Sequence, residues 1–287
     1  MTLLGLLALS FWAWRQRPPA LSIGWHELML PGASLALCSL FAYGARFRHV
    51  MRLVDLDLNR IESMRIVSFA VFCQFFVPVG GGAELAKFIK LRGLAPQRRV
   101  LISAAGVALE HLIGLTVLVA TASVLFGLFR PIAIEAAPLT LVIAALLILA
   151  LAAVVLLRKR ALSARDLVAH LQAHQRDAVL ALGWSLLMHV LLAAAVFVGS
   201  LGWAIPIGYW QILFVLSTAG VLQAVPANFL GVGVADAAGT GLYVALGLPL
   251  SNAVLLASLL IGYRLLVALL GGLWELGRAR HAMAGEH

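Results

Sequence analysis

Two segments interrupt the apolar runs of this sequence, and both have the same order of residues. The first extends from Val77 to Glu84 and the second from Val225 to Asp236. Each contains a proline, then glycines, then a carboxylate that follows an alanine. Proline and clustered glycines stop a helix, and non-helical backbone is tolerated within a membrane only where protein or a water-filled cavity surrounds it. Paired breaks of this kind in two halves of a chain are typical of a transporter binding site. The residues predicted to make them are Pro78, Gly80, Gly81, Gly82, Pro226, Gly231 and Gly233.

The composition indicates that both breaks lie in a membrane protein. Of the 287 residues, 63% are hydrophobic and 11% are charged, and the mean hydropathy is +1.02. A soluble domain of this size could not cover its surface with so few charges. No extramembrane stretch is long enough to fold separately, so we expect residues 1–287 to form a single transmembrane domain.

The apolar segments predict an all-α polytopic protein with about six spanning helices and two re-entrant helical hairpins. A spanning helix needs about 20 apolar residues. The predicted spans are 1–14 (a short one), 29–47, 100–129, 137–157, 179–201 and 252–275. The segments 66–77 and 209–225 run into the breaks, and 83–92 and 235–247 are the predicted returning limbs.

Basic residues predict the orientation. Those in 46–65, 87–99 and 158–176, together with Arg278 and Arg280, fall on one side if the hairpins enter from opposite faces and leave by the face they entered. Because cytoplasmic loops are rich in Lys and Arg, both termini are predicted to be cytoplasmic. The excess of basic residues that gives the net charge of +9 is thus explained by the orientation of the protein in the membrane. The sequence contains no nucleic-acid-binding motif that would explain it otherwise.

The same layout predicts an inverted repeat, with halves at about 1–130 and 137–280. Each half crosses the membrane three times, so the second is upside down relative to the first. A weak echo supports this, since Gly93-Leu94 recurs as Gly247-Leu248. Inverted repeats place a site near the membrane midplane, where the two broken segments meet.

Four ionisable residues lie where hydrocarbon is expected, and each bare charge costs about 2.5–3.5 kcal/mol at the bilayer centre. In the repeat, Glu110 corresponds to Arg264, which suggests an ion pair between the halves. Glu84 and Asp236 each follow a break, where helix N-termini and nearby cations form anion sites. The predicted substrate-binding residues are Glu84, Lys87, Glu110, His111, Asn228, Asp236 and Arg264.

Purely structural roles for these residues stay open. Glu84 and Asp236 can cap the helices that they begin. Lys87 follows Glu84 at a spacing that allows a simple pair on one helix. A pair between Glu110 and Arg264 can also serve only to hold helices together.

No pattern in the sequence indicates an enzyme. There is no Ser-His-Asp set with usable spacing, no nucleotide-binding loop and no zinc motif, since no second histidine follows His26-Glu27 at the required distance. We therefore expect no catalytic residue, no cofactor and no metal.

Several of these residues together resemble one family. Pro78 to Lys87, Ala108-Leu109-Glu110, Pro226 to Asp236 and Gly262-Tyr263-Arg264 are similar to the transmembrane domain of lysylphosphatidylglycerol synthase/flippase proteins, over roughly residues 1–280. The family includes stand-alone members without the synthase domain. The resemblance implies a multi-pass protein of the bacterial inner membrane, with re-entrant helices, that moves lipids between leaflets. Such lipids include anionic phospholipids, hopanoids and polyprenyl-linked sugars.

The sequence also departs from the family pattern. His111 and Lys87 stand where arginine is usual, and Asp236 stands where glutamate is commoner. The spacing from Pro78 to Glu84 is one residue longer than usual. Nothing resembles the aminoacyl-transfer domain, so lipid synthesis is not expected.

The leading hypothesis from the sequence is therefore lipid translocation, with the head group held near the midplane by the two hairpins. A scaffold or assembly subunit of a membrane complex, and a permease for a small solute or coupled ion, are the alternatives. The identity of the lipid and the formation of a homo-oligomer are left open.

Overall fold

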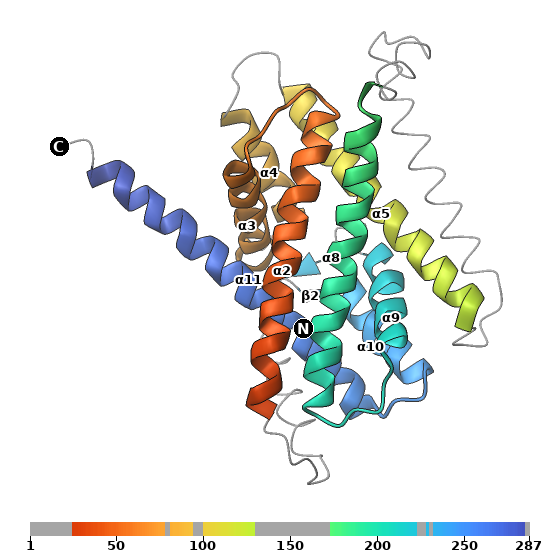
Figure 1. Cartoon of the computed structure of the whole chain (residues 1–287). Coiled ribbons are helices and arrows are strands. Elements are labelled where there is room, and N and C mark those ends of the chain that lie inside the picture. Colours follow the sequence, from red (N-terminus) through yellow and green to blue (C-terminus); the bar gives the residue numbers. More distant parts are fainter. Residues whose placement is uncertain are drawn as a thin grey trace.

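The computed structural model describes residues 25–77, 81–93, 100–129, 173–222, 228–229 and 232–284. These residues form eight helices and one two-stranded ladder (Figure 1). The elements are α2 (Trp25–Arg52), α3 (Arg60–Phe76), α4 (Gly82–Gly93), α5 (Val100–Phe129), α8 (Gln175–Leu201), α9 (Tyr209–Val221), β1 (Asn228–Phe229), β2 (Val232–Gly233), α10 (Val234–Ala245) and α11 (Leu250–Ala284).

The prediction of a helical membrane protein is confirmed. Among the described residues, four helices are long and apolar enough to cross a membrane, over Leu28–Arg52, Ile102–Leu128, Gln175–Leu201 and Leu250–Arg278. They correspond to four of the predicted spans. The other two predicted spans, 1–14 and 137–157, lie outside the described residues.

The first predicted break separates α3 from α4. α3 begins with a capping box, in which Asn59 accepts a hydrogen bond from the backbone of Glu62 and Glu62 accepts one from the backbone of Asn59. The helix ends at Phe76, and Val77 is extended, as expected for a residue before proline. Gly81 has a φ of 85°, which suits glycine, and α4 starts at Gly82. Pro78 and Gly80 lie outside the described residues.

The second predicted break separates α9 from α10 and contains an element that the sequence did not predict. Asn228 pairs with Gly233, and Phe229 with Val232, in a short antiparallel ladder. This ladder keeps backbone groups paired where no helix continues. α10 begins directly after Gly233. Pro226 and Gly231 lie outside the described residues.

The helices pack in a pattern that repeats along the chain. α2 lies along α8 (Figure 1). α3 contacts α4, α2 and α11, whereas α9 contacts α10, α8 and α5. α4 contacts α5, and α10 contacts α11. α5 and α11 each contact both α2 and α8.

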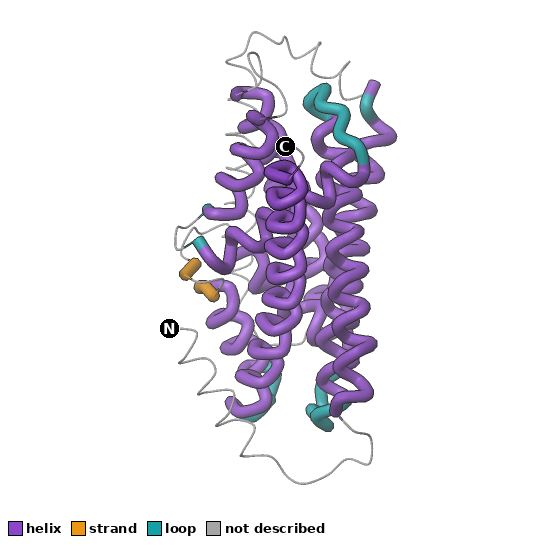
Figure 2. The backbone as a smooth tube through the Cα atoms, turned by 90° about the vertical axis from the view of Figure 1, so that its left-hand side faces the viewer, coloured by secondary structure: helices purple, strands orange, loops and turns teal. Residues whose placement is uncertain are grey.

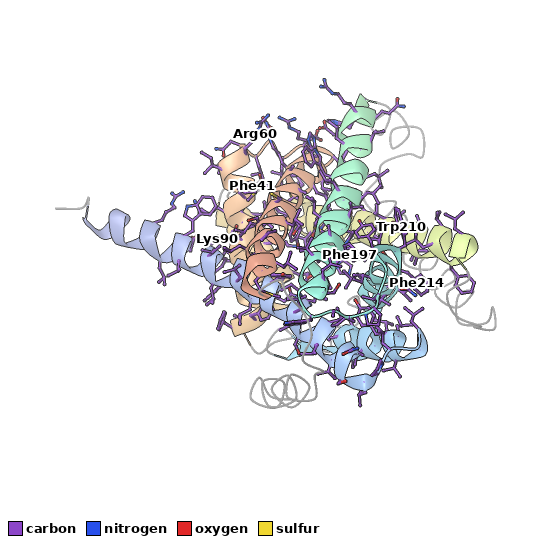
Figure 3. The ribbon with its side chains drawn as sticks, turned by 60° about the horizontal axis from the view of Figure 1, so that its bottom comes forward. Phe41, Arg60, Lys90, Phe197, Trp210 and Phe214 are labelled. Carbon is purple, nitrogen blue, oxygen red and sulfur yellow. The ribbon has the colours of Figure 1, made fainter. Side chains whose placement is uncertain are left out.

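The two-stranded ladder lies near mid-height of the bundle (Figures 1 and 2). In Figure 1, α3 and α4 occupy the upper part, α9 and α10 occupy the lower part, and β2 lies between them. Figure 2 shows the same height for the two strands from the side. The largest apolar core cluster joins α8, α9 and α11 with parts of α2 and α10. Within it, Phe197 of α8 packs edge to face on Tyr209 of α9, with ring centroids 6.0 Å apart, and Figure 3 shows Phe197 and Phe214 in this part of the molecule.

Close contact between α3 and α11 depends on a glycine, which leads to a first prediction. A Cβ at Gly271 would overlap the backbone carbonyl of Ser68 on α3. Gly271→Ala should therefore force the two helices apart and lower the free energy of unfolding by about 1–3 kcal/mol. The measurement is unfolding of the purified protein by titration with a denaturing detergent.

Gly277→Ala is the matched control, because a Cβ at Gly277 on the same helix has no neighbour within 4 Å. This change should leave stability unaltered or raise it by up to about 1 kcal/mol, since alanine favours helix over glycine. Equal effects of the two substitutions would contradict tight packing at Gly271.

Candidate functional site

A buried cluster of charges joins α2, α4 and α5. Glu110 of α5 accepts a hydrogen bond from Lys87 of α4, with 2.6 Å between Nζ and Oε2. The other carboxylate oxygen of Glu110 contacts the guanidinium of Arg46 on α2. The exposed fractions of Arg46, Lys87 and Glu110 are only 5%, 2% and 2%. We call these residues the Glu110 triad. Its two cations share one carboxylate, so the ionised triad carries a net charge of +1.

Neighbouring residues fix the position of Arg46. Its guanidinium lies 4.6 Å from the ring centroid of Tyr43, and Lys87 Nζ lies 5.2 Å from the same centroid. Such contacts with an aromatic face stabilise a cation that has lost water. Arg46 Nη1 donates to Ser185 Oγ at 3.4 Å. Gly114, one turn after Glu110, makes room for the guanidinium, because a Cβ there would lie 3.1 Å from Nη1.

One nitrogen of the triad is a hydrogen-bond donor that is not paired with an acceptor among the described residues. Arg46 Nε is buried and has no hydrogen-bond partner among the described residues. On α8, His189 Nε2 is buried in the same way. His189 follows Ser185 by four positions, so both lie on one face of that helix. Buried polar atoms are usually bonded, so each exception calls for an explanation.

A second charged contact joins α10 and α11. Arg264 Nη1 of α11 is 3.2 Å from Asp236 Oδ1 of α10. The other oxygen of Asp236 accepts the backbone N–H of Gly233 at 2.9 Å, which holds the start of α10. The guanidinium of Arg264 also lies 5.7 Å from the ring centroid of Phe75, near the end of α3. Arg264 therefore contacts both the start of α10 and the end of α3. We call this contact the Asp236–Arg264 pair.

The predicted ion pair between Glu110 and Arg264 is wrong. Glu110 contacts Arg46 and Lys87, and Arg264 contacts Asp236. The physical reason is the path of the chain. The helix after each break packs against the helix that follows it, so α4 supplies a partner for Glu110 on α5 and α10 supplies a partner for Arg264 on α11. The contacts of Glu110 are therefore made within the first predicted half, and the contact of Arg264 is made within the second.

The remaining predicted residues do not join these contacts. Glu84 lies in the first turn of α4 with its side chain 43% exposed, and its Oε1 is 4.0 Å from His111 Nδ1. A Cβ on Gly81 would lie 3.9 Å from the other oxygen of Glu84, so the carboxylate lies beside the break. Asn228 contributes its backbone to the short ladder, and its side chain lies outside the described part of the structure.

Sequence reasoning missed Arg46 and Tyr43. Arg46 was counted with the basic residues on the cytoplasmic side, but it is buried against Glu110. Its position inside the apolar segment 29–47 was an available signal. Tyr43 precedes Arg46 by three positions, which places both on one helix face.

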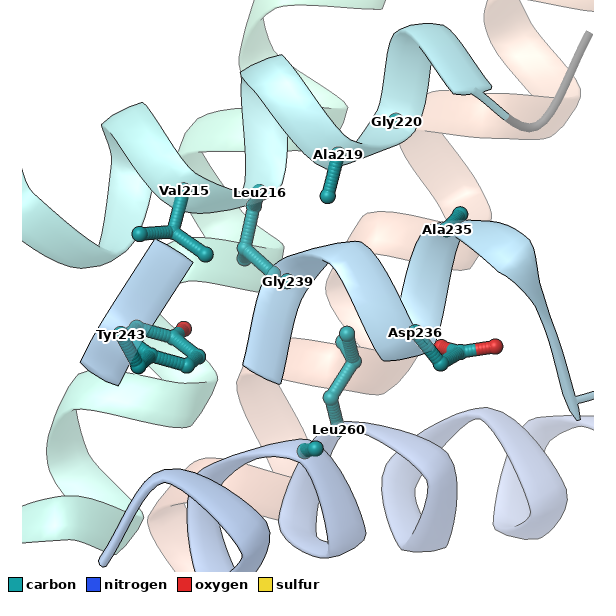
Figure 4. Close-up of a pocket in the computed structure, with 10 residues that line it drawn as sticks. Val215, Leu216, Ala219, Gly220, Ala235, Asp236, Gly239, Tyr243 and Leu260 are labelled. Carbon is teal, nitrogen blue, oxygen red and sulfur yellow. The ribbon is translucent and has the colours of Figure 1, made fainter. Parts of the chain in front are cut away.

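A small pocket lies next to Asp236, between α9, α10 and α11 (Figure 4). Its volume is about 30 Å³, which is room for one water molecule. Figure 4 shows Tyr243 at one side and Asp236 at the other, with Ala219 and Gly239 between the helices. The pocket is therefore too small for a lipid head group. No three His, Cys, Asp or Glu residues in the described ranges gather in a way that could hold a metal ion.

No family model, curated protein or solved structure matches this chain in the comparisons made. The resemblance to the lysylphosphatidylglycerol synthase/flippase proteins therefore stays a prediction from the sequence. The function has to be argued from the two charged clusters and their positions.

Proposed function

We propose that this protein translocates lipids between the leaflets of the bacterial inner membrane, as a flippase-like member of the family that its sequence resembles. The observation that carries the proposal is the Glu110 triad. The net charge of +1 on the triad is offset in part by the carboxylate of Glu84, one turn before Lys87, but that side chain is 43% exposed. Buried charge is costly unless an anion or water balances it. The oxygens of a lipid phosphate supply both negative charge and hydrogen-bond acceptors.

The triad has the groups that such a head group needs. Lys87 carries the excess positive charge, and its ammonium has three donors, of which one is used on Glu110. Arg46 Nε is a buried donor without a partner among the described residues. An anionic phospholipid or a polyprenyl phosphate sugar matches this chemistry, whereas an uncharged hopanoid does not.

The proposal includes two re-entrant hairpins in an inverted repeat. The helix contacts support it, because exchanging α2 with α8, α3 with α9, α4 with α10 and α5 with α11 maps the helix–helix contacts described above onto one another. The opposite placement of the two hairpins and the mid-height position of β2 agree with it (Figures 1 and 2). In this arrangement both broken segments lie near the membrane midplane, and both termini are cytoplasmic.

In the proposed mechanism the head group enters sideways while its acyl chains stay in hydrocarbon. Its phosphate exchanges water for Lys87 and Arg46, which lowers the cost of the polar group at the midplane. The Asp236–Arg264 pair offers a second cation on the side of the other hairpin. Movement from one cation to the next would take the head group across. The reaction is transport, with no covalent bond made or broken.

A scaffold subunit of a membrane complex remains the second candidate. One observation favours it: the pocket beside Asp236 holds no more than a water molecule, and buried ion pairs also hold membrane helices together. In that case the charged residues would fix helix packing, and the purified protein would move no lipid.

A transport assay on one matched pair of lysine variants tests the proposal. Proteoliposomes with fluorescent phosphatidylglycerol in both leaflets are treated with a membrane-impermeant quencher, and the protein should speed loss of the inner label. Lys87→Met should slow this transport about 10-fold to 100-fold, because a hydrogen bond to a charged group contributes about 1.5–3 kcal/mol. Lys90→Met should keep most activity, because Lys90 pairs with Glu275 of α11 and makes no contact with the triad among the described interactions.

Two results would contradict the proposal. One is a wild-type rate no faster than that of empty liposomes, which would favour the scaffold. The other is equal activity of the Lys87 and Lys90 variants, which would show that the triad takes no part in transport.

A further inference from the structure

An open apolar groove runs along the outside of the bundle, away from both charged clusters. It lies between α2, α3 and α11 and has a volume of about 400 Å³, within the usual range for small-molecule sites. Its lining residues are Leu37, Leu40, Phe41, Arg60, Ile61, Met64, Ser68, Leu270, Gly271 and Trp274. The lining is aliphatic and aromatic except at Arg60 and Ser68.

The shape of the groove follows from the packing of its floor and walls. Gly271 has no side chain, so α11 approaches Ser68 of α3 closely and leaves a channel above the contact. Phe41 of α2 and Ile61 of α3 form the open walls, with exposed fractions of 64% and 65%. In a bilayer this surface faces lipid tails, and an alkyl chain matches the apolar lining of the groove.

Arg60 supplies a charge at one end of the groove. It is the first residue of α3, and Figure 3 shows it close to Phe41 in that view. Its guanidinium has no ion-pair or hydrogen-bond partner in the part of the chain that the structure describes. One oxygen of the nearby Glu62 carboxylate accepts the backbone N–H of Asn59 at 3.3 Å. A free guanidinium next to an apolar channel complements a phosphate joined to an acyl chain.

We propose that this groove binds an anionic phospholipid, with one acyl chain along the channel and the phosphate on Arg60. The site is distinct from the triad, and its occupancy does not depend on transport. Arg60 and Trp274 then mark the level of the head groups, since arginine and tryptophan both favour the membrane interface.

Photo-crosslinking tests the occupant directly. p-Benzoylphenylalanine is placed at Phe41 in the full chain, which is then embedded in nanodiscs with equal amounts of phosphatidylglycerol and phosphatidylcholine. After irradiation, mass spectrometry identifies the adducts. Phosphatidylglycerol should exceed phosphatidylcholine about fivefold among them, as expected for one cation near a phosphate. The same probe at Leu128, which is 70% exposed on α5, should give the bulk ratio.

Arginine variants then identify the cause of the enrichment. Arg60→Gln should return the ratio at Phe41 to the bulk value, whereas Arg278→Gln, at an exposed arginine of α11, should leave it raised. Equal ratios at Phe41 and Leu128 would overturn the proposal. So would a main adduct with a second copy of the chain or with residues 1–24. If the probe at Phe41 prevents folding, Ile61 lines the same groove and takes its place. Because the readout is occupancy, failure here would leave the transport proposal untouched.

Discussion

Replacing Glu110 with glutamine should lower the free energy of unfolding by about 3–5 kcal/mol, the usual cost of breaking a buried ion pair from one side. The change leaves the cations of Arg46 and Lys87 next to each other, both buried and without a carboxylate. The measurement is a titration with denaturing detergent in which circular dichroism reports the fraction of unfolded protein. Among the residues that the structure describes, this is the largest stability effect that we expect from an isosteric change.

Two controls separate the triad from ordinary surface charge. Glu84→Gln should cost less than about 1 kcal/mol, because that carboxylate is 43% exposed and lies 4.0 Å from His111. Lys87→Met should cost much less than Glu110→Gln, because it leaves Arg46 and Glu110 as a balanced pair. If Lys87→Met proved as damaging as Glu110→Gln, the assignment of Lys87 as the excess charge would be wrong.

The second large effect is expected at the Asp236–Arg264 pair. Arg264→Gln should cost about 3 kcal/mol, at the low end for a buried pair, because the two side chains keep exposed fractions of 15% and 9%. Adding Asp236→Asn should recover part of this loss. Asparagine still has an oxygen that can accept the N–H of Gly233, so the start of α10 is kept.

A double-mutant cycle distinguishes the two clusters. Glu110→Gln and Arg264→Gln should be additive within about 0.3–0.5 kcal/mol, because the two residues share no partner among the described contacts. Asp236→Asn and Arg264→Gln should not be additive. A strong coupling between Glu110 and Arg264 would mean that they meet in another conformation of the protein.

The sequence predicted the helices and their interruptions well. The segments 29–47, 100–129, 179–201 and 252–275 all fall within helices of the structure. The predicted breaks lie where α3 and α9 end. These predictions succeed because proline, glycine and a long apolar run act on the local backbone, independently of the packing around them.

The sequence alone could not predict which charged residues pair with one another. Position along a helix gives the depth of Glu110 and Arg264 in the membrane, but it does not give the direction in which each side chain points around the helix axis. An apolar helix such as α5 has no polar face from which that direction could be read. Arg46 was missed for a related reason, since an arginine near the end of a span looks like an interfacial residue. The ladder at Asn228 rests on backbone pairing, for which residue type is a weak signal.

The Glu110 triad also bears on how the chain is made. Arg46, Lys87 and Glu110 belong to three helices that leave the ribosome in turn, and Lys87 precedes Glu110 by 23 residues. At roughly 5–20 residues per second, seconds pass between the synthesis of α2 and that of α5. Throughout that interval Glu110, the carboxylate that the arginine contacts in the folded protein, has not yet been made, and a buried charge without its partner is unfavourable. The buried position of Arg46 can therefore form only after α5 has been made, so the final packing of α2 follows the synthesis of a helix more than 60 residues later in the chain.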